Sequence, residues 1–248
     1  VRAREHELAG LDARLKSLEE LDAARAAYGD APRAILALAD GQVNQRGAIA
    51  DYLEVERGYE RAVEACLGDL LQHVIVERSE HAAAGFQVVR EAGTGRCGFL
   101  ITSEAGDVGD QDRYGHANAP DGLCPLSSRV HVDGPFARPI QQAIGDAWIA
   151  PSYEAAAEAC RLTRLPVATP QGDVFRGPHL VSGGGREEAR GILETRREIR
   201  ELRERISADR NALCRLAAET AAFEGTIAYA SNAIAGLNAE HHRQEKAI

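Results

Sequence analysis

The segment Ile192–Leu216 has the sequence ILETRREIRELRERISADRNALCRL, and it decides the architecture of the chain. Its apolar residues recur every three or four positions, with Arg and Glu between them. The first heptad position holds Ile192, Ile199, Ile206, Leu213, Thr220, Ile227 and Ile234. The position three residues later holds Leu202, Asp209, Leu216, Phe223, Ala230 and Leu237. This pattern predicts a long helix that packs along another helix.

The opening stretch of the chain repeats the pattern on a smaller scale. Val1, Leu8 and Leu15 share one heptad position, and Leu11 and Leu18 share the other. We therefore expect two coiled-coil arms, residues 1–28 and 186–248, which pair antiparallel. At about 1.5 Å per residue, the first arm is about 40 Å long and the second about 95 Å. The first arm can therefore cover the second only to about Leu213 or Leu216.

A globular domain, residues 29–185, is expected between the arms, and it contains an internal repeat. When the chain is slid along itself until Ile49 meets Leu126, Ile49–Asp69 lies on Leu126–Asp146 without a gap. We call this alignment the repeat register. Two similar halves follow, residues 29–121 and 122–185, each with the order strand, helix, strand, helix. The predicted fold class is α+β with mixed sheets, inserted between the two antiparallel arms.

The elements of the two halves follow from their periodicity and from helix-capping residues. In the first half we expect strands at Ala48–Val55 and His73–Val76, and helices at Tyr59–Leu71 and from Ser79, as the cap, to about Glu91. In the second half we expect strands at Arg129–Val132 and Trp148–Ile149, and helices at Pro135–Ile144 and after Ser152. Short strands are expected at Phe99–Ile101, Val167–Thr169, Gly172–Phe175 and His179–Ser182.

Charge, cysteine content and hydropathy limit the functions open to the chain. Residues 29–185 carry 13 basic and 21 acidic side chains, which argues against a broad nucleic-acid-binding surface. The five cysteines are widely spaced and contain no CxxC pair, as expected of buried thiols in a reducing cytoplasm. The sequence suggests neither a signal peptide nor a membrane span. The chain has no Met and begins at Val1 inside a heptad, so we expect a piece of a longer coiled coil.

Three segments of the globular domain match motifs of a known family. They are Tyr59–Asp69 (YERAVEACLGD), Gly95–Leu100 (GRCGFL), and Thr169–Gly177 (TPQGDVFRG) with Leu180–Gly184 (LVSGG). With them, residues 28–185 resemble the hinge of bacterial SMC (structural maintenance of chromosomes) proteins, which are chromosome-organising ATPases. Pro178, His179 and Ser182 depart from the usual motif.

The resemblance implies a hinge that dimerises and joins two arms, with no catalytic, cofactor or metal site in this segment. It implies ATP and Mg²⁺ only in head domains outside this chain, where kleisin-type subunits would also bind. It also implies a nucleoid-associated protein of the cytoplasm that serves chromosome condensation and segregation, with no membrane partner. The expected homodimer interface consists of Gly172, Gly177, Leu180, Val181, Ser182, Gly183 and Gly184. Glycine would let two edge strands approach closely there, whereas ordinary turns are the alternative explanation.

Other motifs are weaker. Gly93–Gly98 matches GxGxxG, but a helix precedes it and a strand follows, which is the wrong order for a dinucleotide site. Residues 110–121 imitate a calcium loop without its final Glu, and Gly183–Gly185 has no Lys-Ser/Thr after it. The histidines share no metal-ligand spacing with Cys. The CxxC zinc hook of related DNA-repair ATPases is also absent, which argues against that family.

An arginine-rich root of the second arm is the remaining candidate for direct contact with a ligand. Nine arginines and seven acidic residues lie between Arg186 and Arg215. Two interpretations remain open. The favoured one is a solvated coil face with i,i+4 ion pairs. The other is weak DNA contact at the hinge–coil junction, as the family resemblance implies, through Arg186, Arg190, Arg196, Arg197 and Arg200. A nucleic-acid-binding module with secondary dimerisation is therefore the alternative function.

Overall fold

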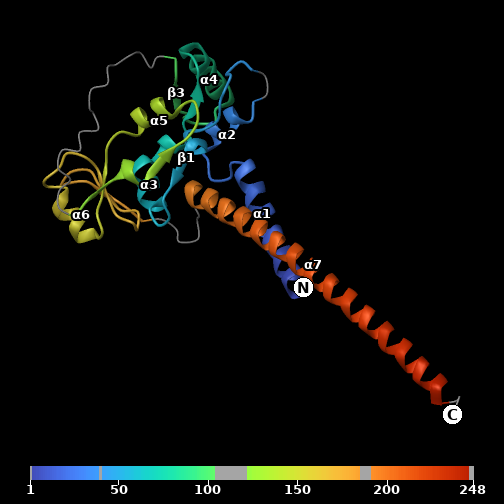
Figure 1. Cartoon of the computed structure of the whole chain (residues 1–248). Helices are drawn as coiled ribbons and strands as arrows, with labels where there is room; N and C mark the ends of the chain where they lie inside the picture. Colours follow the sequence, from blue (N-terminus) through green and yellow to red (C-terminus); the bar gives the residue numbers. More distant parts are fainter. Residues whose placement is uncertain (1, 39–40, 104–121, 185–190, 246–248) are drawn as a thin grey trace. The chain divides into compact units, whose positions relative to one another are not determined.

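The computed structural model describes residues 2–38, 41–103, 122–184 and 191–245 (Figure 1). Contacts divide the chain into two compact units, which we name the hinge unit and the arm unit. The hinge unit is Leu18–Glu198, and the arm unit combines Val1–Ser17 with Ile199–Ile248. The predicted domain limits at residues 28/29 and 185/186 stay a prediction.

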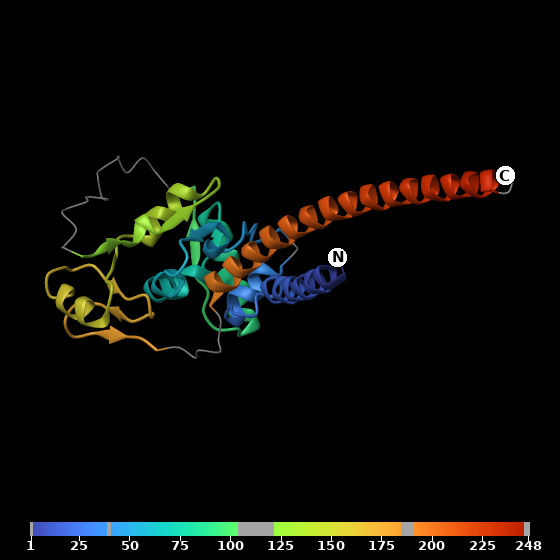
Figure 2. The same cartoon turned by 60° about the horizontal axis from the view of Figure 1, so that its bottom comes forward.

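The arm unit consists of parts of two helices, α1 (Arg2–Ala23) and α7 (Ile192–Glu245). They run in opposite directions where they lie together, as Figures 1 and 2 show. Ion pairs join Glu7 to Arg205 at 2.7 Å and Asp12 to Arg210 at 3.0 Å. The apolar residues Leu202 and Ile206 are buried, as the heptads predict.

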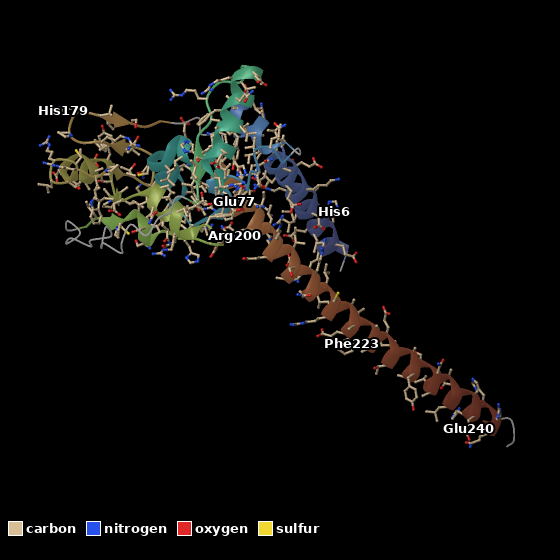
Figure 3. All side chains as sticks on the ribbon, turned by 90° about the horizontal axis from the view of Figure 1, so that it is seen from above. His6, Glu77, His179, Arg200, Phe223 and Glu240 are labelled. Atoms are coloured by element: carbon tan, nitrogen blue, oxygen red, sulfur yellow. The ribbon has the colours of Figure 1, made fainter. Side chains whose placement is uncertain are left out.

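The burial of α7 ends where the unequal arm lengths predict. Leu213 is half-buried, and every described side chain from Cys214 onward is exposed. Phe223 is 69% exposed and Leu237 67% exposed. Figure 3 shows Phe223 and Glu240 on this exposed part of the helix. The expectation of five buried thiols is wrong, because only Cys160 is buried and Cys214 is exposed on the solvent side of α7.

In the hinge unit, several elements of the first copy recur in the second copy at the repeat register. The short 3-10 helix η1 (Ile49–Tyr52) matches η3 (Leu126–Ser128), and strand β1 (Leu53–Val55) matches β5 (Val130–Val132). Helix α3 (Glu60–Leu67) matches α5 (Ala137–Ile144), and both ends of the two helices coincide in the repeat register. A glycine with positive φ, Gly68 or Gly145, ends each of these helices.

The two matching strands pair with each other about a local two-fold axis. In the antiparallel ladder between β1 and β5, Glu54 lies opposite His131, its own counterpart in the repeat. The flanking hydrogen bonds obey the same symmetry. Glu56 N donates to Arg129 O, and Asp133 N donates to Tyr52 O, each at 3.0 Å. The repeat therefore builds a symmetric pair of halves rather than two separate domains.

Each half also contains a parallel strand pair joined by a helical crossover. In the first half, β2 (Val74–Val76), α4 (Ser79–Ala92) and β3 (Phe99–Ile101) form the crossover, with β2 and β3 parallel. In the second half, β6 (Trp148–Ile149), α6 (Tyr153–Ala159) and β7 (Val167–Ala168) do the same.

The second half extends its sheet to five strands, in the order β4-β6-β7-β8-β9. Besides β6 and β7, these are β4 (Cys124–Pro125), β8 (Val174–Phe175) and β9 (Val181–Ser182). Within this five-stranded sheet the β6–β7 pair is parallel, and the other described pairs are antiparallel. The remaining short elements of the hinge unit are α2 (Asp30–Leu36) and η2 (Gly68–Gln72). The α+β class with mixed sheets is confirmed.

The halves exchange their helices. Helix α3 packs on β7 and β8 of the second half, and α5 packs on β3 of the first. One core cluster therefore spans both halves, and in it Ile49, Val63, Leu126 and Ile140 are fully buried. This burial fixes both amphipathic helices through their apolar faces.

Two local expectations are wrong. Ala48–Val55 is not one strand, because the Asp51 carboxylate accepts the backbone N–H of Ala48 at 2.8 Å and closes a 3-10 turn before β1 begins. Ser79 is the first residue of α4 and not its cap; Arg78 holds the cap position without a side-chain bond. The cap at Ser152 is confirmed, since its Oγ accepts the N–H of Ala155 at 3.2 Å.

Candidate dimer interface and arm root

The predicted dimer interface lies at the edge of the five-stranded sheet. Strand β9 pairs with β8 along one edge, and among the described strands it is the outermost strand of the sheet. The side chains of β8 are buried, whereas Val181 is 47% exposed and the preceding Leu180 is 56% exposed. An apolar edge strand of this kind offers both unpaired backbone groups and apolar side chains to another chain.

The glycines around β9 have roles within their own chain. Gly172, Gly177 and Gly184 have φ angles of +97°, +73° and +83°, which side chains with a Cβ rarely adopt. A Cβ at Gly183 would overlap the carboxylate of Asp173. Turn geometry therefore accounts for these glycines, and their part in an interface stays a prediction.

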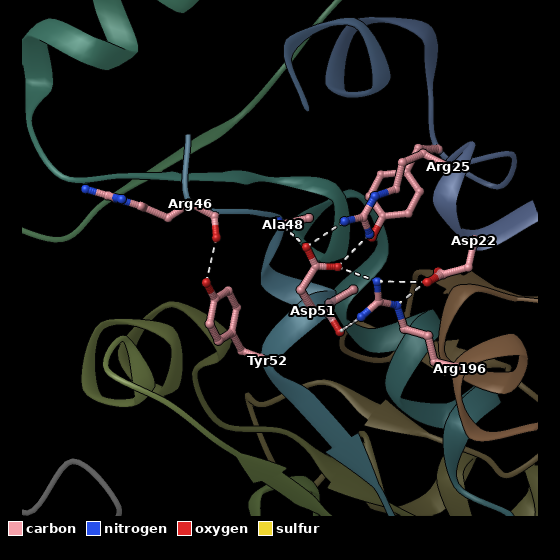
Figure 4. Close-up of polar contacts among 9 residues, drawn as sticks. Asp22, Arg25, Arg46, Ala48, Asp51, Tyr52 and Arg196 are labelled. Atoms are coloured by element: carbon pink, nitrogen blue, oxygen red, sulfur yellow. Dashed lines mark hydrogen bonds and ion pairs between the residues drawn. The ribbon is translucent and has the colours of Figure 1, made fainter. Parts of the chain in front are cut away.

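The root of α7 is held by Asp51 (Figure 4), a residue the sequence analysis did not single out. Its carboxylate accepts hydrogen bonds from Arg25 and from Arg196. The distance from Arg25 Nη2 to Asp51 Oδ2 is 2.9 Å. Arg196 also pairs with Asp22 at 3.3 Å and donates to the carbonyl of Ala50 at 3.3 Å. The side chains of Asp51, Arg25 and Arg196 are 18–21% exposed. Asp51 thus ties the end of α1 and the start of α7 to η1.

Two glutamates of α3 complete the attachment. Arg197 pairs with Glu60 at 2.7 Å, and the Glu60 side chain is only 6% exposed. Glu64 Oε1 accepts the backbone N–H of Leu193 at 2.6 Å. Burial raises the pKa of Glu64 above its ordinary value, and the backbone N–H groups at the start of α7 oppose this shift. The carboxylate therefore caps the positive end of α7.

The five candidate DNA-contact arginines have different positions in the structure. Arg196 and Arg197 are paired with carboxylates of the hinge unit, which gives them a role in holding α7. Arg200 is half-buried on α7 and has interactions of its own. Arg186 and Arg190 lie outside the described residues, as does the calcium-like segment 110–121. DNA contact thus stays a prediction for all five.

The repeat itself contains the signal that could have identified Asp51, Glu60 and Glu64. The repeat register places these three carboxylates on Ser128, Ala137 and Gln141, none of which is acidic. Acidic residues present in one copy only indicate a role that the other copy lacks.

Across the described ranges, no group of three His, Cys, Asp or Glu side chains is arranged to hold a metal ion. In the same part of the chain, no helix combines the length and apolarity that a bilayer crossing requires.

Comparison with known proteins shows what this chain is similar to. The profile described as "SMC proteins Flexible Hinge Domain" matches residues 43–160. The chain is 27% identical over 250 residues to the chromosome partition protein Smc of Myxococcus xanthus, covering 96% of this chain and 20% of that protein. It is 28% identical over 167 residues to Smc of Bacillus subtilis, covering 65% of this chain and 14% of that one. The chain therefore spans about a fifth or less of the length of these relatives.

A solved structure agrees with the sequence comparison at the level of the fold. The SMC hinge domain of Geobacillus stearothermophilus, crystallised as an asymmetric dimer, superposes with a TM-score of 0.73 at 23% identity. The match covers 87% of this chain and 88% of that one. The matched segment contains both copies of the symmetric β1–β5 pair and both exchanged helices. Residues 43–160 of this chain therefore match the hinge domain of SMC proteins in sequence, and the chain matches a solved SMC hinge in fold.

Proposed function

We propose that this chain is the dimerisation hinge of a chromosome-partition SMC protein, and that it joins two coiled-coil arms of one copy to those of a second copy. The observation that carries the proposal is the exposed edge strand β9, with Leu180 56% and Val181 47% exposed beside the buried β8. The relative from Geobacillus stearothermophilus, described as a dimer, supports it.

The physical basis of the proposed interface is strand addition. An edge strand exposes backbone N–H and C=O groups that another edge can pair, and exposed valine and leucine gain by burial. The sheet of the second half would continue into the partner, and two copies related by a two-fold axis would form a closed assembly.

The test places a charge on the edge. We expect Val181→Lys to remain folded, because the side chain is exposed, and to weaken the dimer by at least tenfold. The matched control is Leu162→Lys, at a side chain 80% exposed in the turn after α6. Light scattering at several concentrations should give twice 26.6 kDa for the unchanged chain and for the control. A monomeric mass for the unchanged chain at tens of micromolar would refute the proposal.

Substitution of Gly183 and Gly184 is a less specific test of the interface. A side chain at Gly183 would collide with Asp173, and one at Gly184 would strain a φ of +83°. Such variants would lose stability whether or not two backbones meet there.

The activities of the longer protein belong to the same proposal. ATP hydrolysis with Mg²⁺, and the binding of kleisin-type subunits, would take place at head domains outside this chain. A place on the nucleoid, in the cytoplasm, would follow from the chromosome-partition role. The names of the Myxococcus and Bacillus relatives support this role.

DNA contact at the root of α7 has no observation that favours it over the structural role. Arg196 and Arg197 are bound to carboxylates, so replacing them would also detach the first turn of α7 from Asp51 and Glu60. A salt titration of DNA binding by the unchanged chain is the appropriate test. A phosphate-binding module must lose affinity steeply between 50 and 200 mM salt, by about 10³-fold for six contacts.

A further inference from the structure

A cavity of about 360 Å³ opens on the second half of the hinge unit, between η3, β5 and α5. Its apolar wall is Val130, Val132 and Ile144, and its polar wall is Ser127, Ser128 and Gln141. Gly145, at the end of α5, completes the lining. All of these residues belong to the second copy of the repeat.

The repeat relates this cavity to an occupied place in the first half. In the repeat register its polar wall becomes Ala50, Asp51 and Glu64, and its apolar wall becomes Leu53, Val55 and Leu67. The start of α7 fills this place. Glu64 accepts the N–H of Leu193, and Arg196 binds Asp51 and the carbonyl of Ala50.

The apolar contacts in the first half follow the same correspondence. Ile192 and Leu193, the first two residues of α7, are buried in one cluster with Leu53 and Leu67. Gly191 precedes them, and a Cβ there would overlap the Glu64 carboxylate. A glycine, two branched aliphatic residues and the first helical turn are therefore what this surface accepts.

The two places differ in charge. Ser128 stands where the first half has Asp51, and Gln141 stands where it has Glu64. Ala137 replaces Glu60, the partner of Arg197. The amide oxygen of Gln141 can still accept a backbone N–H at a helix start. Among the described residues that line the cavity there is no carboxylate to neutralise an arginine, so an arginine buried there would pay its full desolvation cost.

We propose that the cavity is a docking site for the first turn of an amphipathic helix from a partner protein, one that begins Gly-aliphatic-aliphatic and has uncharged residues where α7 has Arg196 and Arg197. The uncharged lining of the cavity disfavours α7 of a second copy, because that helix carries both arginines. That helix is also already seated in the first half of its own chain. The hinge thus receives one helix of its own and one foreign helix at symmetry-related places.

Two synthetic peptides test this specificity. The native peptide has the sequence of residues 191–205, GILETRREIRELRER, and the neutral peptide is the same with Arg196→Gln and Arg197→Ala. Calorimetric titration into the 248-residue chain should show one neutral peptide bound per chain, with a Kd below about 1 mM, since a short isolated helix must first be ordered. The native peptide should bind at least tenfold more weakly.

Variants of the chain locate the site. Ser127→Tyr, at an exposed wall position, should weaken binding of the neutral peptide at least tenfold, whereas Ser79→Tyr, exposed at the start of α4, should leave it unchanged. The double substitution Ser128→Asp with Gln141→Glu introduces two of the three carboxylates of the first half, including the counterpart of Asp51, which binds Arg196, and should shift the preference toward the native peptide. An unchanged amide NMR spectrum outside the cavity confirms that each variant folds.

Three outcomes would overturn the proposal. One is failure of the neutral peptide to bind at about 1 mM, the weakest affinity expected of it. Another is equal affinity for both peptides in the unchanged chain. The third is a neutral peptide whose binding is insensitive to Ser127→Tyr, which would place it elsewhere. Loss of dimerisation by Val181→Lys tests a different surface, so the docking site and the dimer can fail independently.

Discussion

The Asp51 carboxylate joins three segments of the hinge unit, so a single change there should be costly. Asp51→Asn keeps the size of the side chain and one oxygen, which can still accept the N–H of Ala48. It removes the negative charge between Arg25 and Arg196, whose side chains are about four-fifths buried. Asn offers a single acceptor oxygen and no negative charge, so it cannot form the ion pairs that both guanidinium groups now make with Asp51.

The size of the loss follows from these contacts. Charge-assisted hydrogen bonds contribute about 1.5–3 kcal/mol each, and a buried charge left without its partner costs about 3–5 kcal/mol. Arg196 keeps Asp22 at 3.3 Å and the carbonyl of Ala50, so its share is reduced. Arg25 keeps only the hydroxyl of Tyr28, at 3.1 Å, among the bonds described for it. We therefore expect the free energy of unfolding to fall by about 3 kcal/mol, or about 6–12 °C in Tm.

Urea unfolding followed by circular dichroism measures this loss. The matched control is Asp12→Asn, because Asp12 binds Arg210 at 3.0 Å with side chains 35% and 60% exposed. That exposed pair should cost less than about 1 kcal/mol. A loss below about 1 kcal/mol at Asp51, the level of an exposed pair, would show that the carboxylate does not hold the end of α1 and the start of α7. A loss no larger than that at Asp12 would show the same.

Further predictions concern the core, ionisation and thiol reactivity. The Glu64→Gln variant should gain stability relative to the unchanged chain as pH rises from 4 to 7. The pKa of Glu64 is raised in the folded state, so ionisation of this carboxyl destabilises the unchanged chain, whereas Gln does not ionise. Urea titrations of both proteins at the two pH values measure the difference, and a stability difference that shrinks as pH rises would contradict the prediction. Gly85→Ala should lower the free energy of unfolding by about 1–3 kcal/mol, because its Cβ would overlap the ring of Phe99. Gly225→Ala has open space around it and should stabilise α7 by up to about 1 kcal/mol. Thermal melts compare the two variants, and equal effects would argue against the overlap. Alkylation at pH 8, followed by mass spectrometry, should modify the exposed Cys214 well before Cys66. Burial raises the pKa of the Cys66 thiol to about 11, so little of it is thiolate at pH 8. Equal alkylation rates at the two cysteines would exclude this burial effect.

The arms and the repeat could be predicted because both are encoded locally. Heptad spacing determines which face of α7 is buried, and Ile199, Leu202 and Ile206 are buried accordingly. The repeat register aligns α3 with α5 to the residue, since insertions between the copies fall after these helices.

The arm root could not be predicted, because its partners are distant in sequence. Asp51 binds one arginine 26 residues before it and another 145 residues after it. No local pattern relates these positions. The same carboxylate also overrides the strand alternation expected at Ala48–Val55, by closing a turn on the backbone N–H of Ala48.

The exchange of helices between the halves has a consequence for fragments of the hinge. Because α3 packs on β7 and β8 while α5 packs on β3, each half supplies strands that cover the helix of the other half. A polypeptide that ends before residue 122 would leave the apolar face of α3 in water, and one that starts there would do the same to α5. Expressed alone, each piece should aggregate or remain unfolded. Produced together, the two pieces should reassemble, as in a split reporter whose signal depends on both parts.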